Sequence, residues 1–289
     1  MKYFVWRSII LYLSIIGCFA SLRAQEKNAV AFAQYLSDYT LYRDLDVWVK
    51  EQLPLQKIPA ADSLRYISGL ALYKQKKLIL SNDYFLEINP ASSFYTSARL
   101  RAAGNATFLN KYTQAKQILL EIPLEDSLLL SLQNLHLAGI SALQRDWKTW
   151  NKYAGNFSQQ YYQIADYEIQ LGQHAQELQQ LKRKSPWVAG SLSAIVPGLG
   201  KVYAGSYKKG IGALLPISVL AIQTYEQYRK RGIKHPLTLF YGSLFSLFYI
   251  GNIWGSALSV QVNYQHETEL LENHILLDMH VPLRNVLGD

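Results

Sequence analysis

The sequence predicts an all-α protein in which stacked helix-turn-helix repeats precede a transmembrane helical hairpin with an interfacial or re-entrant helix before it. Three observations predict this fold. Residues 25–184 repeat with a period of 35, residues 185–264 contain apolar stretches broken by Pro and Gly, and the chain is 49% hydrophobic but only 17% charged. Since an average soluble domain has about 25% charged residues, part of this chain is expected outside water.

Residues 1–24 have the pattern of a secretory signal peptide. A short basic start precedes an apolar stretch from Ser8 to Phe19, and Ala24 is a small residue suited to cleavage before Gln25. The stretch is too short to span a bilayer, which needs about 20 residues. Lipoprotein processing is the alternative, because the residues before Cys18 look like a lipobox and Cys18 would carry the lipid. Cleavage after Ala24 would leave no cysteine and exclude disulfides.

Three glycines mark the repeat. Gly69, Gly104 and Gly139 follow one another at intervals of 35 residues, and each is followed by a polar turn and a second helical stretch. A period near 34 is that of helix-turn-helix repeats. Ala115 belongs to an apolar stripe at helical spacing in the second helix of the middle unit. We expect these four residues to let neighbouring helices pack closely.

The middle unit, Gly104–Ala115, resembles the tetratricopeptide repeat family in its small residue at the helix crossing and in the aromatic and Ala115 of its second helix. The resemblance implies antiparallel helix pairs with a groove that binds peptides or protein partners. In the other units, Leu80 and Trp150 stand in the place of Ala115. Two further helices are expected to flank the repeats, over 28–53 and 157–184.

Three apolar stretches lie within the expected membrane domain, 185–264. The last, 237–262, reaches about 39 Å as a helix and can cross a hydrocarbon core of about 30 Å. The middle one, 210–225, reaches about 24 Å and needs its flanks or a thinned bilayer. The first, 186–195, is too short and ends at a Pro-Gly break, which favours an interfacial or re-entrant helix.

Charges between the two longer stretches predict the orientation. The loop carries Arg229, Lys230, Arg231 and Lys234, which marks it as cytoplasmic. The repeats and the C-terminus are then expected on the periplasmic side of a bacterial inner membrane, with membrane lipids as partners. Lys208 and Lys209 lie on the opposite side from that loop, which conflicts with the rule. The net charge of +8 suits anionic lipid better than nucleic acid, because the basic residues flank apolar runs.

Small residues recur along one face of the last stretch. Gly251, Gly255 and Ser259 stand at every fourth position, and such a face lets helices pack closely in lipid. The partner helix is either the 210–225 helix of the same chain or one from another copy.

A glycine-rich motif follows the first apolar stretch, and its members are Pro197, Gly198, Gly200, Tyr203, Gly205 and Gly210. It resembles the PGxGxxYxG pattern of the TM2 and DUF5683 families, which implies membrane placement and a helical hairpin but no reaction. Lys201 stands where many of those relatives have Gln. A phosphate loop is excluded, because Tyr203 replaces a third glycine and Ile211 stands where a Walker loop needs Lys. The motif therefore predicts a tight backbone turn.

No motif predicts catalysis, a metal or a cofactor. In the tail, 265–289, His266 and Glu267 begin an HExxH-like pattern, but Leu270 replaces the second His. We expect a solvated amphipathic helix there, with His274 and Asp278 as a surface pair. No Gly-x-Ser-x-Gly elbow is present.

The expected function is that of a non-catalytic, membrane-anchored envelope adaptor whose repeats hold a protein partner. In the alternative, the membrane domain acts in assembly, insertion or transport of envelope components and the repeats regulate it.

Overall fold

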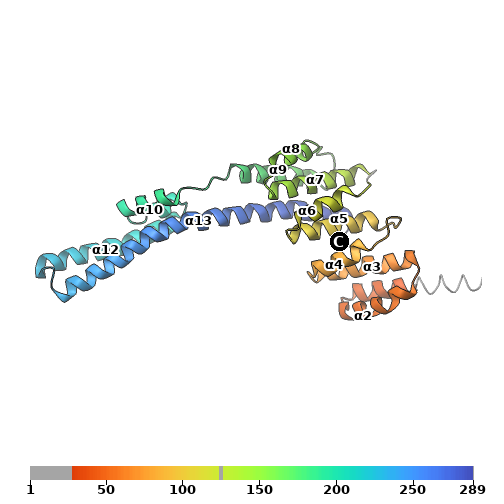
Figure 1. The fold of residues 1–289 in the computed structure, drawn as a ribbon, viewed down its shortest axis with the longest axis horizontal. Helices are drawn as coiled ribbons and strands as arrows, with labels where there is room; N and C mark the ends of the chain where they lie inside the picture. The colour runs from red at the N-terminus through yellow and green to blue at the C-terminus, as the bar shows by residue number, and fades with distance from the viewer. Residues whose placement is uncertain (1–27, 124–125, 289) are drawn as a thin grey trace, which may run out of the picture. The chain divides into compact units, whose positions relative to one another are not determined.

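The computed structural model describes residues 28–123 and 126–288, where all regular structure is helical (Figure 1). The chain forms two compact units. Of the described residues, those up to Gly172 together with those from Ile275 onward form the first, here named the repeat unit, and Gln173–His274 form the second, the hairpin unit. The last helix therefore begins in the hairpin unit and ends in the repeat unit.

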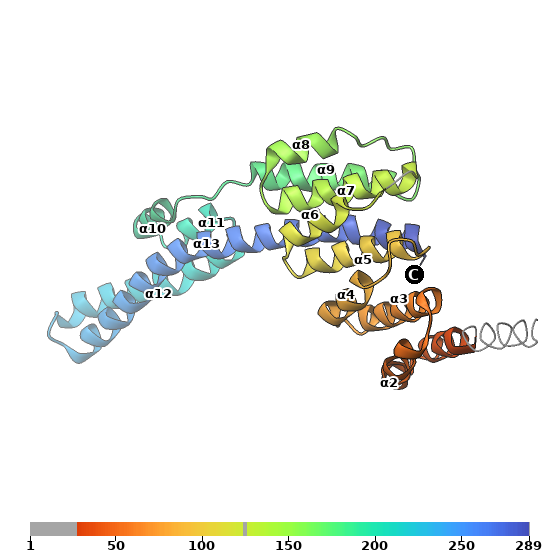
Figure 2. The ribbon, with the colours of Figure 1, turned by 45° about the vertical axis from the view of Figure 1, so that its right-hand side comes forward.

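Consecutive helices of the repeat unit pack on one another, α3 on α4, α4 on α5, and so on to α8 (Figure 2). A helix over 28–38 comes first. It is followed by α2 (Tyr42–Gln52), the 3-10 turn η1 (Leu53–Leu55), α3 (Ile58–Lys74), α4 (Leu78–Leu86), α5 (Tyr95–Phe108), α6 (Tyr112–Leu120), α7 (Ser127–Leu143), α8 (Trp147–Ala154) and α9 (Ala165–Gln180), which continues into the hairpin unit.

Each helix pair has the same left-handed turn between its two helices. Thr40, Lys76, Asn110 and Arg145 have φ of 58°, 60°, 59° and 58°. After each, the next N–H donates to a carbonyl five residues back, as in Lys111 to Ala106 at 2.8 Å, which is the Schellman motif that ends a helix. The described part of the chain therefore contains four such pairs. The expectation of one helix over 28–53 was therefore wrong. The glycine pattern could not reveal this first pair, because Gln34 and not a glycine stands 35 residues before Gly69.

The turns also correct the register of the glycines. The left-handed residues Lys76 and Asn110 are 34 residues apart, so Gly69 is one position out of step with Gly104. One residue turns a helix face by about 100°. The same offset places Ser81, and not Leu80, in the position of Ala115: both are fully buried, whereas Leu80 is exposed.

A buried polar network joins the second and third helix pairs. The amide of Asn105 on α5 donates to Ser81 Oγ at 3.1 Å and to Asn82 Oδ1 at 2.9 Å on α4. In turn, Asn82 donates to the Ala102 carbonyl at 3.2 Å and Ser81 to the Gly69 carbonyl at 2.8 Å. Each of these three side chains is thus satisfied, which fixes how α4 packs on α5.

The flanking helix expected over 157–184 is shorter, because α9 begins at Ala165. Gln159 adopts a φ of 54°, and its N–H donates to the Glu168 carboxylate at 2.8 Å. Burial raises the pKa of Glu168, and backbone N–H donors partly offset that rise. The chain before α9 therefore folds back onto the helix rather than extending it.

The hairpin unit contains α10 (Pro186–Ile195), α11 (Leu199–Tyr203), α12 (Tyr207–Arg231) and most of α13 (Pro236–Leu287). α12 and the first half of α13 lie side by side and antiparallel in both views (Figures 1 and 2). Among the described residues, α13 alone is long and apolar enough to cross a membrane. α12 is 25 residues long with Pro216 inside it, and it does not meet the same criterion.

Candidate functional site

The C-terminal end of α13, residues 275–287, packs against the first helices of three pairs. We name this stretch the terminal segment, and the surface of α3, α5 and α7 that it covers the inner face. The expectation of a solvated tail was wrong for residues 275–287: Ile275, Met279 and Leu283 are buried within the repeat unit. They recur at every fourth position and form one helical stripe. Burying each such side chain contributes about 1.5 to 3 kcal/mol.

Two of the repeat glycines lie under this stripe. A Cβ on Gly139 would lie 2.1 Å from Met279 Sδ, and one on Gly104 would lie 3.0 Å from Leu283 Cδ2. Gly69 has a different role, since its Cβ would lie 2.5 Å from the ring of Phe85 on α4. Its offset in register accounts for this difference. Close helix packing within the repeats, expected for all three glycines, therefore holds at Gly69, whereas Gly104 and Gly139 make room for the terminal segment.

Polar contacts also join the terminal segment to the inner face. The hydroxyl of Tyr73 and Nε2 of His280 are 2.7 Å apart, and the Phe108 ring meets the His280 ring edge-on with centroids 5.0 Å apart. The buried guanidinium of Arg101 donates to the Leu287 carbonyl at 3.5 Å and to the Tyr66 hydroxyl at 3.2 Å. The inner face therefore recognises a helix by both shape and hydrogen bonds.

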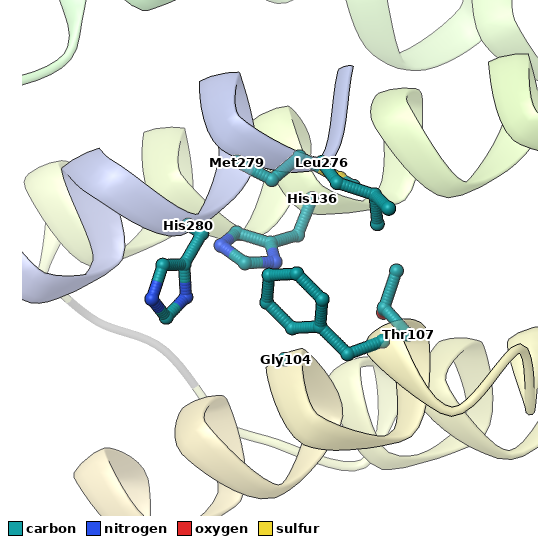
Figure 3. A pocket seen from close by; sticks show the side chains of 7 residues that line it. Gly104, Thr107, His136, Leu276, Met279 and His280 are labelled. Atoms are coloured by element: carbon teal, nitrogen blue, oxygen red, sulfur yellow. The ribbon is translucent and has the colours of Figure 1, made fainter. Parts of the chain in front are cut away.

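His136 of α7 lies beside His280 in this interface (Figure 3). Its ring is buried, and neither ring nitrogen has a hydrogen-bond partner among the described residues. Burial, followed by the charge of His280, lowers the pKa of His136 to about 4, although the nearby backbone of Met279 offsets part of this. The adjoining cavity, of about 10 Å³, has room for roughly one water. His136 is therefore neutral at pH 7.

A second concavity lies between α2, α3 and α4. This lateral groove has a volume of about 470 Å³ and combines aromatic, charged and apolar side chains: Tyr42, Arg43, Asp46, Lys50, Leu72, Gln75, Lys77, Leu80, Asp83 and Tyr84. Asp46 and Lys50 form an exposed ion pair at 2.8 Å. Burial, and then the charge of Asp46, raises the pKa of Tyr84, so its hydroxyl stays protonated at neutral pH.

The glycine-rich motif brings three helices of the hairpin unit into backbone contact. Gly198 begins α11 with a φ of 87°, and a Cβ there would lie 2.1 Å from the Gly210 carbonyl oxygen of α12. A Cβ on Gly200 would lie 1.9 Å from the carbonyl oxygen of Ala189 on α10. Larger residues cannot fit at these two positions. Pro197 precedes this turn, and Gly205, with a φ of 98°, ends the short α11.

Polar groups complete this corner. Tyr203 accepts hydrogen bonds from Lys184 Nζ at its carbonyl, at 2.8 Å, and from the Ser185 N–H at its hydroxyl, at 3.4 Å. Ser193 Oγ accepts from the Gly200 N–H at 2.9 Å and donates to Ser256 Oγ at 2.7 Å. The motif is thus a packing device for α10, α11, α12 and α13.

The small residues of α13 do not lie where close packing was expected. A Cβ on Gly251 would meet nothing within 4 Å, and one on Gly255 would meet only Lys201 Cε at 3.8 Å. Ser259 donates to its own helix, at the Gly255 carbonyl. The buried face is one position further along, at Asn252, Ser256 and Val260. The buried positions do recur every fourth residue, but they are shifted by one residue, which turns them to a different face of the helix. The face differs because α13 contacts α10 and α11 as well as α12.

Cys18 and the expected signal peptide lie outside the described residues. Within residues 28–123 and 126–288, no group of three or more His, Cys, Asp or Glu side chains could hold a metal ion. Comparison of the chain with protein-family models, curated proteins and solved structures finds no match.

Proposed function

We propose that this protein is a non-catalytic, membrane-anchored scaffold of the bacterial cell envelope, in which tetratricopeptide-like repeats bind a protein partner. The observation that carries the proposal is the packing of the terminal segment on the inner face. This packing shows that the inner face accommodates an amphipathic helix. The end of the chain also lies in the repeat unit, although the hairpin unit precedes it in the sequence.

That return favours a hairpin topology. Since residues 275–287 pack with the repeats, both ends of the hairpin unit lie on the same side of any membrane, and an inserted hairpin unit crosses an even number of times. α13 supplies one crossing and α12 is proposed as the other. Exposed apolar side chains such as Leu247, Trp254 and Leu258 would face lipid. The basic loop at 229–234 would be cytoplasmic. The repeats would then lie in the periplasm, as expected for a protein exported by a signal peptide.

Because the inner face is covered by the terminal segment, the lateral groove is the proposed site for a partner protein. Aromatic and Arg side chains are enriched where proteins bind one another. Leu80 and Ile79 are exposed beside the charged residues Arg43 and Lys77. An apolar anchor flanked by basic residues suits a partner segment with an apolar side chain next to an acidic one.

The alternative function, an active role of the membrane region in assembly or transport, also has one observation in its favour. Lys201 and the buried Asn252 line a cavity between α11, α12 and α13. Most of the cavity wall is apolar, which fits a lipid better than a polar cargo.

Photocrosslinking in native membranes tests the scaffold proposal. A p-benzoylphenylalanine at Leu80 should give one discrete protein adduct, and the same replacement at the exposed Tyr162, outside the groove, should not. The double replacement Arg43→Glu and Lys77→Glu should abolish the Leu80 adduct. Equal adducts from Leu80 and Tyr162, or an adduct unaffected by the charge reversal, would count against the groove. Reporter fusions at Gly232 (cytoplasm expected) and after Asp289 (periplasm expected) test the topology.

A further inference from the structure

A cavity of about 370 Å³ opens between α11, α12 and α13 in the hairpin unit. We name it the lysine cavity, and its lining residues are Lys201, Gly212, Ala213, Pro216, Ile217, Leu247, Phe248, Gly251 and Asn252. Two of its glycines border open space, because a Cβ on Gly212 or on Gly251 would meet nothing within 4 Å. The expected role of Gly251 in helix packing is thus replaced by one in shaping this cavity.

The lysine cavity contains an unsatisfied amide. Asn252 is 4% exposed, and neither its Nδ2 nor its Oδ1 has a hydrogen-bond partner among the described residues. A buried polar group without a partner costs about 1 to 3 kcal/mol. Pro216 has no N–H to donate to the Gly212 carbonyl one turn earlier, so this carbonyl lacks its regular helical donor. The cavity therefore offers a donor and acceptors to a ligand.

Cations gather at one end of the cavity. Lys201 lines the cavity, and its side chain lies beside Gly255. Among the described residues, no acid forms an ion pair with its amine. On α12, Lys208 and Lys209 stand one turn before Gly212 and Ala213, so they extend the same helix face beyond the cavity. These are the two lysines that conflict with the positive-inside rule, and a ligand with a negative charge at this end would account for their position.

The rest of the wall is apolar. Ile217, Leu247 and Phe248 lie on the side of the cavity that faces away from the lysines along α12 and α13. From Gly212 to the basic loop at Arg229 the helix rises about 26 Å, close to the thickness of a hydrocarbon core of about 30 Å. In a spanning hairpin, the lysine end would therefore lie at the membrane boundary and the apolar wall inside the bilayer.

We propose that the lysine cavity binds an anionic phospholipid, with the phosphate at Lys201, the headgroup beside Lys208 and Lys209, the glycerol ester oxygens at the Asn252 amide, and an acyl chain along Ile217, Leu247 and Phe248. The inference rests on the membrane insertion in the proposed function but not on its protein partner. A zwitterionic lipid of the same chains would bind less tightly, because its ammonium group would face three lysines.

Native mass spectrometry of the full chain in a nonionic detergent tests the proposal. Phosphatidylglycerol and phosphatidylcholine with identical acyl chains are added separately, and lipid-bound protein is counted. Phosphatidylglycerol should be retained preferentially. Lys201→Gln should lower its apparent affinity about fivefold, the effect of about one lysine at an anionic lipid surface. Gly212→Leu should reduce retention as well, because the leucine fills the cavity without a clash.

The matched control is Lys234→Gln, the same change of charge in the exposed basic loop, which should leave retention unchanged. Circular dichroism and gel filtration verify that each variant is folded. Equal retention of the two lipids, or equal losses from Lys201→Gln and Lys234→Gln, would overturn the site and indicate diffuse charge attraction. If the full chain does not fractionate with membranes, the proposed membrane placement is refuted. If it fractionates with membranes but shows no lipid preference, only the proposal for the lysine cavity is refuted.

Discussion

Gly139 and Met279 should be strongly coupled, because they meet where the terminal segment crosses α7. A Cβ on Gly139 would lie 2.1 Å from Met279 Sδ and 2.7 Å from its Cγ. Gly139→Ala therefore forces the Met279 side chain to move. Overpacking of this kind costs about 1 to 3 kcal/mol, against which alanine gains about 1 kcal/mol of helix propensity over glycine.

Met279→Ala alone should cost about 2 to 5 kcal/mol, since Met279 is 2% exposed and its removal leaves a cavity. With Met279 truncated, the clash is gone and the new methyl of Gly139→Ala partly fills the cavity. We expect Gly139→Ala to be neutral or stabilising in that background. The coupling free energy of the double-mutant cycle is then about 1 to 3 kcal/mol.

Hydrogen exchange of residues 275–287 in the full chain measures the free energy that opens the terminal segment. Leu277→Ala is the matched control, because Leu277 is on the same helix but 51% exposed, and it should change the opening free energy by less than about 0.5 kcal/mol. Additive effects of Gly139→Ala and Met279→Ala, or equal effects of Met279→Ala and Leu277→Ala, would show that the terminal segment does not pack on α7 as described.

Three other outcomes follow from the structure. The pKa of His136 is about 4 in the fold, below the ordinary value of about 6.5 for a histidine in an unfolded chain. The unfolded chain therefore binds more protons between these values, and the free energy of unfolding should fall by about 3 kcal/mol from pH 7 to pH 4. Urea titrations should show a flatter pH profile for His136→Gln, and an unchanged profile would contradict the burial of His136 as a neutral group. Asn105→Ala removes the donor to two buried groups on α4 and should lower the free energy of unfolding by about 1 to 3 kcal/mol in the same assay. Asn156→Ala, at an exposed contact, should lower it little. Similar losses of stability in the two variants would argue against the buried network. Gly200→Ala should unfold or aggregate the hairpin unit, because a Cβ would lie 1.9 Å from a backbone oxygen. Gly251→Ala should leave the hairpin unit folded, as judged by gel filtration in detergent. The same elution behaviour of the two variants would refute the close contact of α10 and α11.

Periodic positions could be read from the sequence because helices impose them. The interval of 35 residues, the Pro-Gly break after Ile195 and the apolar run of α13 each reflect a local rule of backbone geometry or burial. The first helix pair was missed because Gln34 stands 35 residues before Gly69, where the other three pairs have a glycine. Local patterns also gave the wrong face of α13, since a stripe of small residues does not say which neighbour it meets.

Helical periodicity, an apolar stretch long enough to span a membrane and the lack of a recognisable catalytic motif were determined by the sequence itself. Only the tertiary structure decided that the terminal segment covers the inner face, that Gly104 and Gly139 serve it, and that Lys201 and Asn252 share a cavity. The physical reason is that the sequence encodes which faces are apolar, whereas their partners depend on contacts between residues far apart in the chain, from 51 positions for Lys201 and Asn252 to 179 for Gly104 and Leu283. Met279 and Gly139 illustrate this, because neither residue carries a local signal of the other.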